Sequence, residues 1–182
     1  MNLNQFIGKS QLACMRDACR GDEGAYFQNM IANLKRTIAA MPKTYETDGQ
    51  GDEATAVLHY FIGGSDWYIS ERDTDGHQHQ AFGFACLNGD YENAELGYIS
   101  ILELIQNGVE LDLYYKPETI GAIKAHYQKR YENREENAPN ELEGWLFEGT
   151  CPAEGCPEGC YVELDGRCSH GYKSVVLNMG LI

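Results

Sequence analysis

The sequence lacks any uninterrupted apolar run of the roughly 18 residues that a membrane-spanning helix requires. Its first residues, MNLNQFIGKSQLACMRD, also lack the apolar stretch of a secretory signal peptide. From these two absences we expect a cytoplasmic protein. Its 182 residues suffice for one ordinary domain with a small appendage and are too few for two full-sized enzymatic domains.

Common catalytic signatures are missing as well. There is no glycine-rich phosphate loop, no motif around a nucleophilic Ser or Cys, and no HExxH motif. Acidic residues such as Asp66 and Glu95 lie near predicted strands, but no spacing pairs two of them for acid-base work or Mg²⁺ binding. We therefore predict no catalytic residues and expect a non-enzymatic protein. A metal-dependent hydrolase of unknown substrate is the open alternative.

Positive charge is scarce in the middle of the chain. Residues 53–115 carry 11 acidic side chains and one basic one, and so hold ten of the fourteen excess negative charges. Such a segment repels phosphate backbones and anionic lipids, which disfavours direct binding to nucleic acid or a membrane. An acidic surface can also serve solubility alone.

The same segment is rich in aromatic side chains. Aromatic residues anchor protein interfaces, and charge steers the encounter with a partner. We therefore predict that the partner is a host protein with a basic surface. The predicted interaction face consists of Trp67, Glu71, Asp73, Glu110 and Asp112.

Hydrophobic periodicity predicts the secondary structure. Apolar residues recur at three- and four-residue steps from Phe27 to Met41, which predicts an amphipathic helix that ends at Pro42. Ser100 with Glu103 forms a capping-box pattern at the start of a second, shorter helix. Alternating apolar residues predict four strands, at residues 54–62, 67–71, 81–87 and 109–113.

Strands and helices do not alternate regularly along the chain. This order predicts an α+β fold in which helices pack on a small antiparallel sheet of about four strands. The predicted divisions are an N-terminal helical segment (1–52), an α+β core (53–134), a charged linker (135–146) and a Cys-rich segment (147–182).

Four of the seven cysteines lie within 18 residues of one another near the end of the chain. Cytoplasmic thiols stay reduced, so such a cluster indicates metal binding more than disulfide bonds. Zinc takes four nitrogen or sulfur ligands, and we predict Cys151 with Cys156 and Cys168 with His170, with Cys160 as the alternative ligand. The 36 residues of this segment are too few for a good core, so we predict a structural zinc.

Three histidines outside the Cys-rich segment have simpler interpretations. His77 and His79 alternate in a polar loop, and we predict solvated imidazoles there in preference to metal ligands. His59 lies among apolar residues of a predicted strand, which favours a hydrogen-bonded core histidine over a catalytic base.

Three stretches, HYFIGGSDWYISERD, ELGYIS and GVELDL, carry a family resemblance that covers about residues 39–120. In these the chain resembles domain-of-unknown-function family 2958, which comprises small proteins encoded by phages and plasmids. The text CPAEGC followed by DGRCSHGYKS also resembles a Cys/His zinc knuckle at the ends of such proteins, in which Cys160 is an additional cysteine.

The resemblance implies an accessory protein of a mobile element that acts in a bacterial host, and it implies no catalytic residues. Together with the acidic segment, it leads us to expect a protein that binds a host protein and inhibits a defence system such as CRISPR or restriction. A nucleic-acid-associated protein that uses the knuckle is the alternative, although Arg167 and Lys173 give it little basic support. The oligomeric state is left open.

Overall fold

The computed structural model describes residues 2–182, and it describes the side chains of all of these except residues 133–140. The chain divides into two compact units, which we call the N-terminal unit (Met1–Gln128) and the C-terminal unit (Lys129–Ile182). The helical segment predicted for residues 1–52 therefore belongs to the same unit as most of the predicted core. The protein has the predicted α+β fold.

The N-terminal unit begins with a short 3-10 helix, η1 (Leu3–Gln5), and two α-helices, α1 (Lys9–Ala18) and α2 (Gly24–Ala40). Helix α2 carries the predicted apolar stripe and ends where Met41 adopts an extended conformation before Pro42. A residue before proline avoids the helical conformation for steric reasons, which explains the position of this end.

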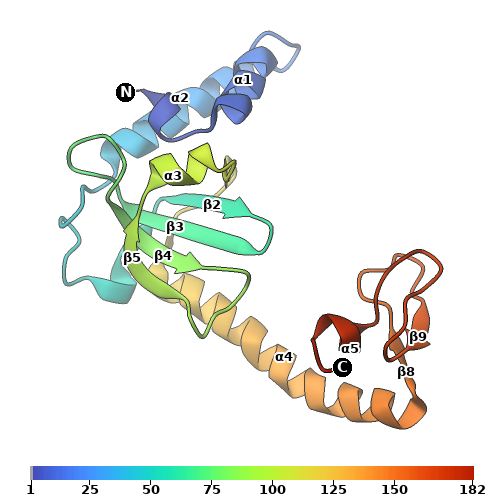
Figure 1. Cartoon of the computed structure of the whole chain (residues 1–182). Helices are drawn as coiled ribbons and strands as arrows, with labels where there is room; N and C mark the ends of the chain where they lie inside the picture. The colour runs from blue at the N-terminus through green and yellow to red at the C-terminus, as the bar shows by residue number, and fades with distance from the viewer. Residues whose placement is uncertain (1) are drawn as a thin grey trace. The chain divides into compact units, whose positions relative to one another are not determined.

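Five antiparallel strands form the central sheet in the order β5-β4-β3-β2-β6 (Figure 1). Their bounds are β2 (Leu58–Ile62), β3 (Ser65–Glu71), β4 (Ala81–Cys86), β5 (Glu95–Ile99) and β6 (Glu110–Leu111). The strands β1 (Thr55–Ala56) and β7 (Glu118–Thr119) form a separate antiparallel pair. Strand β1 follows the 3-10 helix η2 (Gly51–Glu53). The sheet thus has one strand more than predicted, because β5 was missed.

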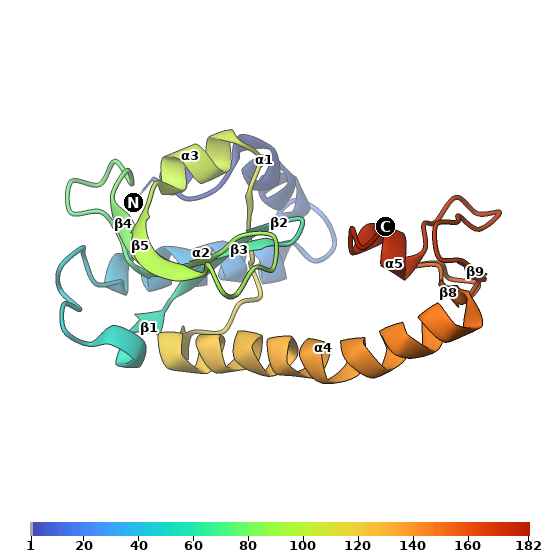
Figure 2. The same cartoon turned by 60° about the horizontal axis from the view of Figure 1, so that its bottom comes forward.

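Helices cover both faces of the sheet. The helices α1, α2 and α3 (Ile101–Gln106) lie on one face, and the first turns of α4 (Ile120–Glu148) lie on the other (Figures 1 and 2). The strand register separates the side chains accordingly, because neighbouring residues of a strand point to opposite faces. Leu58 lies opposite Ile69 on the first face, and His59 lies opposite Tyr68 on the second.

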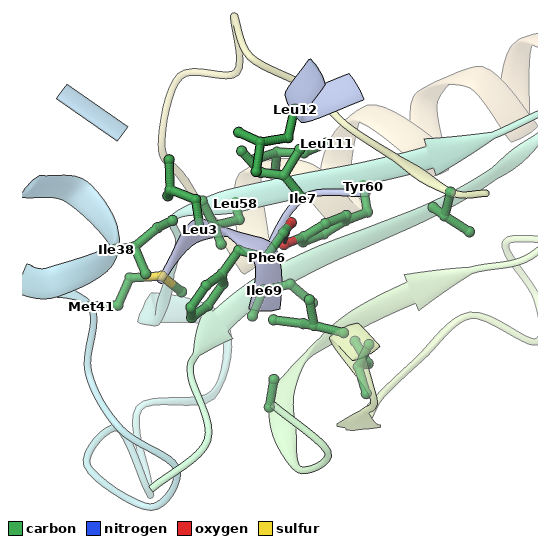
Figure 3. Packing of buried hydrophobic residues seen from close by; sticks show 14 of the residues in the cluster. Leu3, Phe6, Ile7, Leu12, Ile38, Met41, Leu58, Tyr60, Ile69 and Leu111 are labelled. Atoms are coloured by element: carbon green, nitrogen blue, oxygen red, sulfur yellow. Dashed lines mark hydrogen bonds between the residues drawn. The ribbon is translucent and has the colours of Figure 1, made fainter. Parts of the chain in front are cut away.

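The main core lies between the sheet and the N-terminal helices (Figure 3). Residues from η1 and the segment after it, including Phe6 and Ile7, are buried there with Ile38 of α2. The hydroxyl of Tyr60 in β2 donates a hydrogen bond of 2.8 Å to the carbonyl of Phe6, so the buried phenol is satisfied. The N-terminal segment is therefore part of this core.

A smaller core lies under the start of α4. There Ile120 and Ile123 of the helix are buried with Phe84 and Cys86 of β4. Strands β3 and β4 approach closely at Gly83, where an added Cβ would lie 2.0 Å from the carbonyl oxygen of Tyr68. Only glycine fits at this position of the strand.

The C-terminal unit consists of the end of α4, a hairpin of β8 (Thr150–Pro152) and β9 (Tyr161–Glu163), and the short helix α5 (Val175–Asn178). The stretch 135–146, predicted to be a linker, falls within the bounds of α4, and the side chains of 135–140 lie outside the described residues. Within the described part of the chain, no helix combines the length and the apolar character needed to cross a bilayer.

Candidate metal centre

The C-terminal unit has few buried side chains with which to build a core. Its buried residues among those described are Cys151, Ala153, Cys168, Ser174 and Val176. Small side chains such as these remove little apolar surface from water. The fold of this unit therefore needs another source of stability.

The first half of the candidate site is the turn between β8 and β9. The amide of Cys156 donates to the carbonyl of Ala153 at 3.2 Å, and the carbonyl of Cys156 accepts from Gly159 at 3.1 Å. Gly155 and Gly159 have φ angles of +74° and +61°, which side chains with a Cβ rarely adopt. The chain therefore coils tightly enough to bring Cys156 and Cys160 to the same end of the hairpin.

The second half is a tight turn between Arg167 and Lys173, which form an isolated antiparallel bridge. The amide of Cys168 donates to the carbonyl of Tyr172, and the amide of Gly171 donates to the carbonyl of Cys168, each at 2.9 Å. Cys168 and the exposed His170 of this turn lie close to Cys156 and Cys160 of the β8–β9 turn.

Four ligand atoms meet where the two turns face each other. The sulfurs of Cys156, Cys160 and Cys168 and a ring nitrogen of His170 all lie within 4.8 Å of one another. His170 Nδ1 is 3.4 Å from Cys160 Sγ and 3.6 Å from Cys156 Sγ, and the Sγ atoms of Cys156 and Cys168 are 3.9 Å apart. These four side chains are close enough to bind a metal ion.

Three of the six distances between these atoms are close to the edges of a tetrahedron around zinc. With Zn–S bonds of about 2.3 Å and Zn–N bonds of about 2.0 Å, tetrahedral geometry gives S–S edges of about 3.8 Å and S–N edges of about 3.5 Å. The observed separations of 3.9, 3.6 and 3.4 Å lie close to these values. The residues present thus fit this ion both in ligand type and in spacing.

The thiols of the cluster influence one another's ionisation. Burial opposes ionisation of Cys156, but hydrogen bonds from the amides of Cys160 and Glu158 and from His170 outweigh it and lower the pKa of this thiol to about 6. For Cys160, the hydrogen bond with Cys156 has the largest effect. Together with burial and the charges of Cys156 and Cys168, it raises the pKa of the Cys160 thiol to about 11. A divalent cation removes this competition because it stabilises every thiolate that it binds.

Cys151, one of the four predicted ligands, is not in the cluster, and the alternative ligand Cys160 takes its place. Cys151 is fully buried within β8, where its Cα pairs with Val162 of β9. The hairpin register thus keeps Cys151 in the ladder, whereas Cys156 and Cys160 lie in the turn. The spacing of the ligands is therefore CxxxC followed by CxH.

The chain matches no protein-family model, no curated protein and no solved structure. The resemblance to family 2958 therefore stays a prediction. The assignment of a metal site does not require a relative, because it rests on the ligand types, their spacing and the distances between the ligand atoms.

The predicted interaction face is wrong at Glu71, which is only 3% exposed. Its carboxylate accepts hydrogen bonds from the amide of Tyr45 at 2.9 Å and from the amide and hydroxyl of Thr47 at 2.6 Å each. An irregularity in the β3–β4 register between Ile69 and Glu71 turns this side chain away from its alternating position. Glu71 is a structural residue that holds the 44–47 loop.

Asp73 is also buried, with 4% of its surface exposed. Burial opposes its ionisation, but hydrogen bonds from the amides of Gln80, Asp75 and His79 outweigh it and lower the pKa of the carboxyl. Asp73 therefore organises its own loop and is not part of a binding face. The imidazoles of His77 and His79 are exposed in this loop, as predicted.

Asp112 takes part in a chain of polar groups under α4. His59 Nε2 lies 2.8 Å from Asp66 Oδ1, and His59 Nδ1 lies 3.2 Å from Asp112 Oδ2. The hydroxyl of Tyr127 donates to Asp66 at 2.7 Å, and the ring of Tyr68 stacks on His59 at 4.5 Å. Burial opposes protonation of His59, but its bonds to the two carboxylates outweigh it and raise its pKa. His59 is the hydrogen-bonded core histidine that was predicted.

The remaining two residues of the predicted face are accessible to different degrees. Trp67 is half-buried against the main core, and Glu110 is exposed on the edge strand β6. The five residues therefore do not form one continuous surface. The sequence does not reveal this, because a bulge and two loop contacts decide which carboxylates are buried.

Proposed function

We propose that the C-terminal unit is a structural zinc module and that the protein is a non-enzymatic binding protein for a partner with a basic surface. The cluster of Cys156, Cys160, Cys168 and His170, with ligand atoms within 4.8 Å of one another, carries the zinc assignment. Three sulfurs and one imidazole are ligands typical of structural zinc. Four protein ligands fill the tetrahedron, so no position is left for a reacting water.

Exposed carboxylates support the binding role. Those in residues 53–115 are Glu53, Asp75, Asp90, Glu92, Glu95, Glu103 and Glu110. Arg72 is the single basic residue in this stretch. A field of this sign attracts a basic protein surface and repels nucleic acid. The bacterial host and a defence-system target are further parts of the proposal that rest on the family resemblance.

Metal analysis of the purified protein tests the zinc module. We expect about one zinc per chain in the wild type and in Cys151→Ala, and loss of zinc in Cys160→Ala. Both substitutions remove one thiol from the same unit, so Cys151→Ala is the matched control. Replacement by Co²⁺ adds a second measurement, because tetrahedral thiolate ligation gives intense visible absorption. Zinc retained by Cys160→Ala and lost from Cys151→Ala would restore the originally predicted ligand set.

Affinity capture from a bacterial lysate tests the binding role. We compare the wild type with Glu95→Lys/Glu110→Lys, and use Glu141→Lys/Glu143→Lys as a control with the same net charge. Selective loss of a captured protein in the first variant supports an acidic binding face in the N-terminal unit. Capture that is equal for both variants, or absent at moderate salt, contradicts it.

A further inference from the structure

A hollow of about 450 Å³ lies on the sheet face that carries α1, α2 and α3. Trp67 and Ala85 contribute to it from neighbouring strands, where their Cα atoms are paired. Glu103 and Leu104 of α3 line it from the helix. All of these residues belong to the N-terminal unit.

The hollow exists because small residues lie next to a large one. Trp67 has Tyr60 on one side but only the methyl group of Ala85 on the other. On the edge strand β5, Gly97 has no side chain, and a Cβ added there would meet nothing within 4 Å. The six residues of α3 form a short wall and leave this end of the sheet face open.

Most residues of its lining are apolar, and some of them are accessible. Ile62 and Leu87, which line the hollow with Trp67, are 45% and 51% exposed. Isolated exposed aliphatic residues are ordinary on protein surfaces, but several around one concavity indicate a contact site. Tryptophan is also among the residue types enriched at the energetically dominant positions of interfaces.

Its surroundings are negatively charged. Glu103 lines the hollow, and Glu95 lies opposite Ala85 in the β4–β5 ladder on the same face. Residues 73–115 contain no lysine or arginine. A ligand with apolar and positively charged groups therefore complements the site, whereas an anionic one does not.

Building on the binding role proposed above, we infer that this hollow receives a short peptide segment of the partner protein. The segment places a leucine or phenylalanine side chain against Trp67, Ile62 and Leu87, and flanking Lys or Arg residues lie beside Glu95 and Glu103. Burial of the apolar side chain supplies affinity, and the charges supply orientation and salt dependence.

A titration with a defined probe tests this inference. The probe is the hexapeptide KRLFRK, and the control peptide is KRSSRK, which has the same length and charge. The protein is the full-length, zinc-loaded chain with Trp145→Phe, so that Trp67 is the single tryptophan. We expect KRLFRK to change the fluorescence of Trp67 and to shift its indole resonance in ¹H–¹⁵N NMR spectra, and KRSSRK to do neither.

Variants separate the hollow from general charge attraction. Ile62→Ser/Leu87→Ser and Glu95→Gln/Glu103→Gln should each weaken KRLFRK binding by roughly tenfold. Tyr114→Ser, at an exposed tyrosine outside the hollow, and Glu53→Gln are single-residue controls of the same substitution types and should bind normally. Each variant is checked for folding before peptide is added. Its Trp67 indole resonance and its thermal unfolding temperature should be close to those of the parent protein.

Several outcomes overturn the inference. They are equal binding of the two peptides, binding that leaves Trp67 unperturbed, an unchanged affinity after Ile62→Ser/Leu87→Ser, and no binding of KRLFRK. The broader binding role is judged separately by the capture experiment with Glu95→Lys/Glu110→Lys. A partner lost from that variant but retained by both Ile62→Ser/Leu87→Ser and Glu95→Gln/Glu103→Gln places the acidic contact outside the hollow.

Discussion

The two units of this protein are stabilised in different ways. The N-terminal unit buries large side chains such as Phe6, Tyr60 and Ile69 between a five-stranded sheet and its helices. The C-terminal unit buries mainly small ones and instead brings Cys156, Cys160, Cys168 and His170 together. A segment too small to offset its chain entropy by hydrophobic burial can do so through metal ligation. The comparison predicts that each unit responds to a different perturbation.

Zinc removal should have the largest effect, and only on the C-terminal unit. Structural zinc contributes about 10–16 kcal/mol of apparent binding free energy in small zinc peptides, and this binding is coupled to folding. We expect a chelator to abolish amide protection between Thr150 and Ser174 while the amides of the central sheet stay protected. Hydrogen exchange measured with and without EDTA checks this. Loss of protection in both units, or in neither, would contradict the comparison.

A core truncation should affect the N-terminal unit alone. Ile38 is fully buried in α2, and Ile38→Ala should lower the free energy of unfolding of that unit by about 2–5 kcal/mol. Ile31→Ala is the matched control, because Ile31 lies in the same helix but is only partly buried, and it should cost less. Urea unfolding followed by Trp67 fluorescence in a Trp145→Phe background measures both, and zinc content should not change.

The sequence predicts the elements whose local signals are strong. The apolar stripe of α2 and the hydrogen bond of the Ser100 cap to the amide of Glu103 are present as expected. Strand β5 was missed, and its residues, ELGYI, directly precede that cap. Its alternation is weak, since Gly97 contributes no side chain. Such a strand is defined by pairing with β4, which is a tertiary contact.

The candidate sites show the same limit. Ligand types and clustering predicted a metal site, and the choice between Cys151 and Cys160 depended on where the β8–β9 ladder ends. For the carboxylates, the sequence gives the charge but not the burial. Glu71 accepts a hydrogen bond from the amide of Tyr45, which lies 26 residues away in the sequence. Asp73 accepts one from the amide of His79 in its own loop. Long-range loop contacts of this kind leave no periodic signal.

His59 offers a pH-dependent way to perturb the N-terminal unit. Its pKa is raised in the folded state, because bonds to Asp66 and Asp112 outweigh the effect of burial. A raised histidine pKa adds stability that is fully present below the unfolded value of about 6.5 and is lost as the pH rises through the folded pKa. We expect the unfolding free energy of the N-terminal unit to fall as the pH rises from about 6.5 through the folded pKa of His59. The decrease should be smaller than the loss of unfolding free energy caused by Ile38→Ala.

Two histidine variants identify the source of this pH dependence. His59→Gln should flatten the decline, since glutamine does not titrate. His126→Gln should leave it unchanged, because the side chain of His126 is 73% exposed and lies 3.8 Å from Glu118. Urea unfolding at a series of pH values from about 6 to about 9 provides the measurement. A wild-type stability that is constant across this range would show that folding does not raise the pKa of His59.

The smallest expected effect comes from the two serine caps, one in each unit. Ser100 accepts from the amide of Glu103 in α3, and Ser174 accepts from the amide of Leu177 in α5. Loss of such a cap costs about 1 kcal/mol. Ser100→Ala should lower the unfolding free energy of the N-terminal unit by this amount and leave zinc affinity unchanged. Ser174→Ala should instead weaken zinc binding by roughly tenfold or less, because folding of its unit is linked to the metal. If Ser174→Ala lowers the stability of the N-terminal unit and leaves zinc affinity unchanged, the two units are not independently stabilised.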